Sequence, residues 1–208
     1  MEQEGVIKYS LDFKQERLNP RDKLLQALNT SRTIMKVHCL IGQENHRYGG
    51  YGFGNISVRC APSTASFLIS GTQTGRESEL SMAHLACVTD IDAEQNILKA
   101  QGEIEPSSEG MTHGVLYRQS EQVHAVIHVH SPDIWQNSEA LNLPSTSEMI
   151  PYGTPEMALA VQELCARLIN NTSAPIVFVM KGHEDGVVAA GVSLAECAKS
   201  LLYYLDLS

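Results

Sequence analysis

The segment HAVIHVHSP (residues 124–132) sets three histidines among β-branched and small apolar residues. Val and Ile favour strands, so this composition predicts a buried β-strand. Residues two apart in a strand point to the same face, so His128 and His130 project side by side while the residues between them face a core. An H-x-H pair on rigid backbone can give a metal ion two imidazoles. His124 has the same parity but lies at the strand entrance, and we do not expect it to be a ligand.

The other patterns predict helices and strands along the whole chain. Apolar residues at helical spacing run up to Gly42 in the first helix, and Pro106 followed by two serines marks the start of another. We expect helices over residues 20–42, 78–85 (short), 105–120, 155–169 and 193–207, and strands over 55–60, 66–71, 86–92, 124–131 and 174–182. This order indicates an α/β domain with helices packed on a central sheet.

Length, charge and composition limit the classes to which this chain can belong. A chain of 208 residues, 43% hydrophobic and 19% charged, suits one globular domain. The net charge of −9 argues against a nucleic-acid partner, because a phosphate backbone attracts clustered Lys and Arg. No run approaches the roughly 18 apolar residues of a membrane span, and the polar first residues do not resemble a secretory signal. Five scattered cysteines form neither a disulfide framework nor a zinc knuckle, so we expect a cytoplasmic protein.

Two further residues are candidates to complete a metal site with His128 and His130. His183 follows the expected strand APIVFVM and stands in the turn KGHEDG, and Glu109 lies at a helix start after PSS. Three histidines and a carboxylate that can leave the metal form a catalytic pattern, since chemistry needs an open coordination position. The alternative is a set of buried, hydrogen-bonded histidines that hold no metal.

Three short motifs are candidates for an anion site. GNISVR (54–59), SGTQTG (70–75) and PSSE (106–109) each offer backbone N–H groups near glycine or a helix start, together with Asn, Ser or Thr side chains. Such groups bind phosphate without a cluster of lysines. The alternative for each motif is an ordinary turn or a helix cap.

The order of these motifs resembles the class II aldolase/adducin family: GNISVR, the SGTQTG turn, EPSSE followed by His113, AVIHVHSP and a late histidine before a Gly turn. The resemblance runs from about residue 22 to residue 206, which leaves residues 1–21 as an N-terminal extension and 22–208 as the family domain. It implies a single-domain, three-layer α/β/α sandwich with a central, mainly antiparallel sheet. It also implies a cyclic homotetramer with sites at the subunit interfaces.

The resemblance also implies roles for particular residues. A zinc ion would be held by His128, His130, His183 and Glu109, although this ligand set also suits Mn²⁺, Fe²⁺ or Co²⁺. A phosphate would be held by Asn55, Thr74, Gly75, Ser107 and Ser108, with Thr72 as the alternative to Thr74. The implied reaction is aldol cleavage of a small phosphorylated sugar or hydroxy-ketone. In it, zinc stabilises an enediolate as a Lewis acid and Glu109 moves the proton as general base.

Other residues leave the reaction open between an aldolase, a dehydratase and a sugar-phosphate epimerase. Glu148 in SEMIPYG resembles the acid/base glutamate of dehydratases in the same family, and its alternative is a surface charge. His113 lies one turn after Glu109 on the same helix face and is a candidate substrate contact. Glu184 and Asp185 either bulge outward or face the site.

The loop HRYGGYGFG (residues 46–54) has three interpretations: it closes over a ligand, contacts a neighbouring subunit or is a surface loop. A non-catalytic, adducin-like interaction domain is the remaining alternative to an enzyme. Such a domain has no physical reason to keep buried imidazoles that face one another.

Overall fold

The computed structural model describes residues 6–169 and 175–208, and these form one α/β domain. In these ranges an eight-stranded sheet has the order β1-β7-β6-β5-β4-β8-β10-β9. Its strands are β1 (Ser10–Gln15), β4 (Asn55–Arg59), β5 (Phe67–Ser70), β6 (Leu85–Asp92), β7 (Ile97–Gly102), β8 (Ala125–His130), β9 (Ile176–Val179) and β10 (Gly186–Gly191). A separate ribbon joins β2 (Gly42–Gln43) to β3 (Gly52–Phe53). The helices are α1 (Asp22–Val37), α2 (Gly110–Gln119), α3 (Pro132–Gln136), α4 (Pro155–Ile169) and α5 (Leu194–Leu207).

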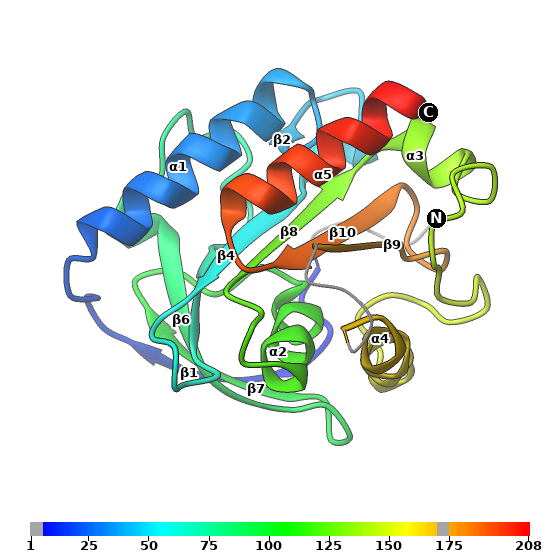
Figure 1. Cartoon of the computed structure of the whole chain (residues 1–208). Coiled ribbons are helices and arrows are strands. Elements are labelled where there is room, and N and C mark those ends of the chain that lie inside the picture. The colour runs from blue at the N-terminus through cyan, green and yellow to red at the C-terminus, as the bar shows by residue number, and fades with distance from the viewer. Residues whose placement is uncertain (1–5, 170–174) are drawn as a thin grey trace.

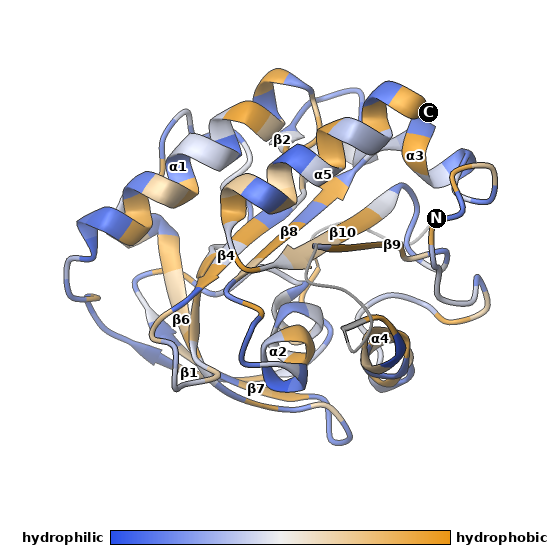
Figure 2. Ribbon diagram, viewed as in Figure 1, coloured by the Kyte–Doolittle hydropathy of each residue, from blue (hydrophilic) through white to orange (hydrophobic). Residues whose placement is uncertain are grey.

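Two helix layers enclose the sheet (Figure 1). α1 and α5 lie over one face and pack on β4, β8 and β10, whereas α2 and α4 lie over the other and pack on β5, β6 and β9. Apolar residues gather along the strands between the two layers (Figure 2), and a cluster of buried side chains lies under each helix pair. Only β1 and β7 pair in parallel among the strands described. The structure confirms the expected three-layer sandwich with a mainly antiparallel sheet.

The strand predicted from HAVIHVHSP is β8, and all six of its residues are buried. Its side chains alternate between the two cores. One set packs under α1 and α5 and consists of Ala125, Ile127 and Val129. Val126 packs under α2 and α4, and the pleat of the strand puts His128 and His130 on that same side.

The neighbours of β8 fix what lies beside the histidines. β4 and β10 pair with β8 from its two sides, both in antiparallel orientation. The register sets Asn55 of β4 opposite His128, and Gly186 of β10 opposite His130. A slip of one residue would turn both imidazoles into the wrong core, so this register is strongly specified.

The first helix is shorter than the sequence predicts. α1 ends at Val37 and not at Gly42, because Cys39 adopts a left-handed backbone conformation with φ 56°. The amide of Cys39 donates to the Lys36 carbonyl, and the amide of Leu40 donates to the Met35 carbonyl. This pair of bonds is a Schellman-type helix end, made here without glycine.

The prediction of a short helix over residues 78–85 is wrong. In this segment only Met82–His84 are helical, and they form a turn of 3₁₀ helix. The Asn29 side chain of α1 accepts from the Leu80 amide and donates to the Leu80 carbonyl, both at 2.8 Å. These backbone groups are therefore satisfied by another helix and not by a helix of their own.

The sequence patterns also missed β1, β7 and β10. β1 comes from the segment before residue 22 and adds an edge strand beside β7. Residues 1–5 of that segment, and Ala174 at the start of the strand predicted over 174–182, lie outside the described residues. Among the helices that the structure describes, none has the length and apolar character needed to cross a membrane.

We expect the central strand to be a large source of stability. Ile127 is fully buried, so Ile127→Ala should lower the free energy of unfolding by about 3 kcal/mol. Val37→Ala, on a side chain that is 74% exposed, should change it by less than about 0.5 kcal/mol. Urea unfolding of both variants measures the difference, and equal losses would contradict this packing.

Candidate metal and anion site

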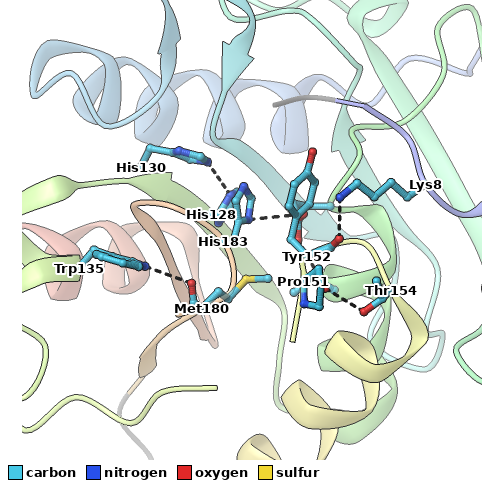
Figure 3. Close-up of polar contacts among 11 residues, drawn as sticks. Lys8, His128, His130, Trp135, Pro151, Tyr152, Thr154, Met180 and His183 are labelled. Atoms are coloured by element: carbon cyan, nitrogen blue, oxygen red, sulfur yellow. Dashed lines mark hydrogen bonds and ion pairs between the residues drawn. The ribbon is translucent and has the colours of Figure 1, made fainter. Parts of the chain in front are cut away.

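Three buried histidines meet at one end of the sheet. His128 and His130 come from β8, and His183 comes from the turn between β9 and β10 (Figure 3). Each offers a ligand atom, and these atoms all lie within 4.8 Å of one another. The Nε2 atoms of His128 and His130 are 3.2 Å apart. The structure thus brings together the three histidines predicted as ligands, and His124 is not part of the group that it describes.

His128 and His130 lie in an environment that favours the neutral form of their imidazoles. Burial lowers the pKa of His128 and of His130 well below the usual range, and the nearby His183 lowers both further. A neutral imidazole is the form that binds a metal ion. The side chains are therefore ready to act as ligands without first losing protons.

Glu109 supplies a carboxylate to the same cluster. It is 1% exposed and is the cap residue directly before α2. Its Oε1 atom lies 3.7 Å from Nδ1 of His183, and its Oε2 atom accepts a hydrogen bond of 2.7 Å from the Thr112 hydroxyl. Three imidazoles and a carboxylate are a donor set that fits a divalent cation such as zinc.

A small pocket beside this cluster contains all the residues predicted to bind phosphate. Its lining comprises Gly52, Gly54, Asn55, Gly71, Thr72, Gln73, Thr74, Gly75, Ser107 and Ser108. The pocket adjoins the histidines, since Asn55 is the partner of His128 in the sheet. The Thr74 hydroxyl donates to the Gly71 carbonyl at 2.9 Å. Thr72 and Thr74 both line the pocket, so both remain candidates for binding the phosphate.

Close packing explains the glycine that ends the SGTQTG turn. A Cβ atom on Gly75 would lie only 2.2 Å from the carbonyl oxygen of Gly42, so a larger residue would displace the backbone.

The Asn55 Oδ1 atom is buried and accepts no hydrogen bond within the described residues. A buried polar atom of this kind is expected to meet a ligand or water.

Two cations of α1 lie behind the anion pocket and were missed by the sequence reasoning. Arg32 is buried and donates to the carbonyls of Thr74 and Glu77 at 2.7 and 2.8 Å. Lys36 donates to the Gly75 carbonyl at 2.9 Å. Their charges add positive potential beneath a pocket suited to an anion. Their spacing of four on one helix was the available signal.

The loop before GNISVR lines one side of a larger cleft of about 860 Å³ next to His183. Tyr48 in this loop donates a hydrogen bond of 2.7 Å to Asp185 and accepts one of 3.1 Å from Arg47. Its ring packs edge-on against His130 at 4.7 Å between ring centroids. Burial, and then the bond to Asp185, raise the pKa of Tyr48. Asp185 therefore links the histidine turn to the loop, a contact that no sequence pattern indicated.

Glu148 and His113, the two candidate substrate contacts, lie in different places. Glu148 lines the cleft, as does Glu184. His113 is fully buried, its Nδ1 atom lies 2.7 Å from the Ser57 hydroxyl, and that hydroxyl lies 2.8 Å from the Tyr117 hydroxyl. Burial lowers the pKa of His113 to about 3. His113 is not among the residues that line either cavity.

The fold and the buried histidine cluster define an α/β domain with a candidate metal centre. A family model described as "Class II Aldolase and Adducin N-terminal domain" matches residues 37–207, and the chain belongs to this family. Over 163 residues it is 27% identical to a 3-oxo-tetronate 4-phosphate decarboxylase from Haemophilus influenzae, a match that covers 71% of this chain and 70% of that protein.

Solved structures have the same fold. YgbL from Klebsiella pneumoniae, described as a candidate aldolase, epimerase or decarboxylase, superposes with a TM-score of 0.62 at 18% identity, over 89% of this chain and 87% of that one. An L-fuculose 1-phosphate aldolase superposes with a TM-score of 0.60 at 18% identity, over 90% of this chain and 85% of that one. At these identities the likeness is one of fold.

The histidine cluster generates a test of metal binding. Zn²⁺ should bind at one ion per chain and raise the thermal unfolding midpoint, because it binds the folded state preferentially. His128→Ala should weaken binding by more than about 100-fold, whereas His124→Ala, in the same segment but outside the cluster, should not. Calorimetric titration measures both, and equal losses in the two variants would contradict the assignment.

The buried imidazoles also predict how stability depends on pH. The pKa values of His113, His128 and His130 are lowered in the folded chain, so the unfolded chain binds more protons below about pH 6.5. The metal-free protein should therefore lose stability between pH 7 and pH 5, by up to about 1.4 kcal/mol per pH unit for each histidine. Urea unfolding at several pH values measures this slope. His113→Gln should reduce the slope, and a flat profile would contradict the burial.

Proposed function

We propose that this chain is a divalent-metal-dependent lyase that breaks a carbon–carbon bond in a small phosphorylated hydroxy-ketone through an enediolate. The observation that carries the proposal is the convergence of three buried imidazoles and the buried Glu109 carboxylate beside a pocket rich in glycine, serine and threonine. His128, His130 and His183, with Glu109, would hold the cation. When bound there, the cation supplies Lewis-acid polarisation of a carbonyl and the hydroxyl next to it.

The substrate phosphate would bind in the pocket formed by Asn55, Thr74, Gly75, Ser107 and Ser108. A helix start such as that of α2 is a favourable place for an anion, and Arg32 and Lys36 add positive charge behind the pocket. Fixing the phosphate sets the reacting carbons at a constant distance from Glu109, which avoids an entropic cost in the reaction. Glu109 then takes a proton from the substrate, or returns one to the enediolate carbon.

A decarboxylase is the second candidate, and the Haemophilus influenzae relative favours it. A 3-oxo acid loses CO₂ when the bond between the carboxyl carbon and carbon 2 breaks and its electron pair forms the enediolate with the ketone at carbon 3. Protonation at carbon 2 then gives a phosphorylated hydroxy-ketone. Aldol cleavage produces the same type of enediolate, so one site serves both reactions. Dehydration and epimerisation remain alternatives that use the same metal and a different proton route.

The family resemblance supports the remaining parts of the proposal. Zinc is the preferred metal because three histidines and a carboxylate suit it, although this ligand set also suits Mn²⁺, Fe²⁺ and Co²⁺. We further propose a cytoplasmic homotetramer, with residues 22–208 as the family domain. The competing proposal is an interaction domain without catalysis, and proton exchange distinguishes the two.

Enediolate formation can be tested without knowledge of the natural substrate. Dihydroxyacetone phosphate is the simplest phosphorylated hydroxy-ketone of this class and the hydroxy-ketone that decarboxylation of 3-oxo-tetronate 4-phosphate would leave. In D₂O, the zinc-loaded protein should exchange one carbon-bound hydrogen of this compound for deuterium, which proton NMR follows. Glu109→Gln should slow exchange by about 100-fold or more, since it removes the acid–base group.

Matched variants separate chemistry from binding. Glu103→Gln, on an exposed carboxylate of the same segment, should exchange at the wild-type rate. Ser108→Ala should raise the concentration of compound needed for half-maximal exchange. No exchange above the metal-free background, by protein shown to hold zinc, would refute the enediolate reaction and leave the interaction domain as the better account.

A further inference from the structure

Two residues near the N-terminus touch the candidate site although they lie outside the region matched by the family model, which begins at residue 37. Lys8 and Tyr9 immediately precede β1. Each contacts a different segment of the site, and these segments are distant from each other in sequence. We call Lys8 and Tyr9 the N-terminal clamp.

Tyr9 holds the start of α2. It is 5% exposed, and its hydroxyl donates a hydrogen bond of 2.8 Å to the Ser107 carbonyl. A Cβ atom on Gly110 would lie 3.2 Å from this hydroxyl, so the tyrosine packs directly against the first residue of the helix. Glu109, the candidate ligand and proton carrier, stands between these two contact points in the chain. Burial and the nearby Glu109 charge both raise the pKa of Tyr9.

Lys8 contacts Tyr152, the residue that packs against His183 (Figure 3). Its ammonium group lies 3.5 Å above the centre of the Tyr152 ring and donates to the Tyr152 carbonyl at 3.1 Å. The Tyr152 ring also stacks on the His183 ring, with 4.3 Å between the ring centroids and an interplanar angle of 16°. A Cβ atom on Gly153 would lie 2.8 Å from the Lys8 side chain, which shows how closely the lysine stem is packed. Cation–π contacts and ring stacking both constrain orientation.

The clamp therefore connects the segment that carries Glu109 with the segment that carries Tyr152, whose ring stacks on His183. The carboxylate of Glu109 and the ring of His183 approach within 3.7 Å of each other, and a metal ion requires such ligands to be fixed within a fraction of an ångström. Because Lys8 and Tyr9 are adjacent in sequence, the backbone between them limits how far the two segments can separate.

We propose that Lys8 and Tyr9 are positioning residues of the metal centre, which set the separation of Glu109 and His183. This inference rests on the proposed function, because it requires that these residues hold a cation. An ordinary edge-strand contact would add stability to the fold but would leave metal affinity unchanged. The two interpretations therefore differ in what they predict for zinc binding.

The test compares the zinc affinity of clamp variants with that of matched controls in the full-length chain. Lys8→Met removes the charge and keeps the stem, and Tyr9→Phe removes only the hydroxyl. Lys14→Met alters a largely exposed lysine of β1, and Tyr203→Phe alters a tyrosine that is 59% exposed. Competition with a chromogenic chelator gives the zinc dissociation constant, and thermal unfolding of the metal-free proteins is recorded alongside.

Each clamp variant should raise the zinc dissociation constant by about tenfold, as is usual when a residue supporting a metal ligand is removed, and the controls should stay within about twofold of wild type. A wild type that binds zinc together with clamp variants that bind it equally tightly, whatever their unfolding temperatures, would overturn the clamp and leave the proposed function intact. A wild type that binds neither Zn²⁺ nor Mn²⁺ would overturn the metal centre and the clamp with it.

Discussion

The pairing register of β8 is the constraint on which the rest of the site depends. Its alternation sends Ile127 into one core and His128 and His130 toward the other. Antiparallel partners on both sides then fix Asn55 beside His128 and Gly186 beside His130. The anion pocket and the histidine cluster are therefore held at a constant separation by sheet hydrogen bonds. Burying an imidazole in a central strand is costly unless its ring nitrogens meet other polar groups or a cation.

Local patterns predicted those parts of the molecule that depend on local physics. The alternation in residues 124–132, the helix that follows Pro106 and the order of the polar motifs were sufficient for the fold class and for grouping the three histidines, although α2 begins at Gly110 and not at residue 105. The limits of elements were less predictable. Cys39 ends α1 in a conformation usually reserved for glycine, and Asn29 binds the backbone of a segment whose composition favours a helix.

The contacts that could not be predicted join segments distant in sequence. The residues that flank Arg32 in the sequence do not indicate its hydrogen bond to the Thr74 carbonyl. Those that flank Tyr48 do not indicate its hydrogen bond to Asp185. The same is true of Lys8 and Tyr9, whose partners lie about a hundred or more positions away. Tyr48 adopts a left-handed backbone conformation, a strain that a fold retains where surrounding contacts enforce it. These long-range contacts hold together the segments that surround the metal-ligand and anion-binding motifs.

Anomalous diffraction at the zinc edge, from crystals of the zinc-loaded protein, tests the central claim most directly. The account predicts one strong peak per chain enclosed by the imidazoles of His128, His130 and His183, at zinc–nitrogen distances of about 2.0–2.1 Å. A map whose peaks all lie on the surface, with His128 and His130 still in contact with each other at the distance seen here, would contradict it.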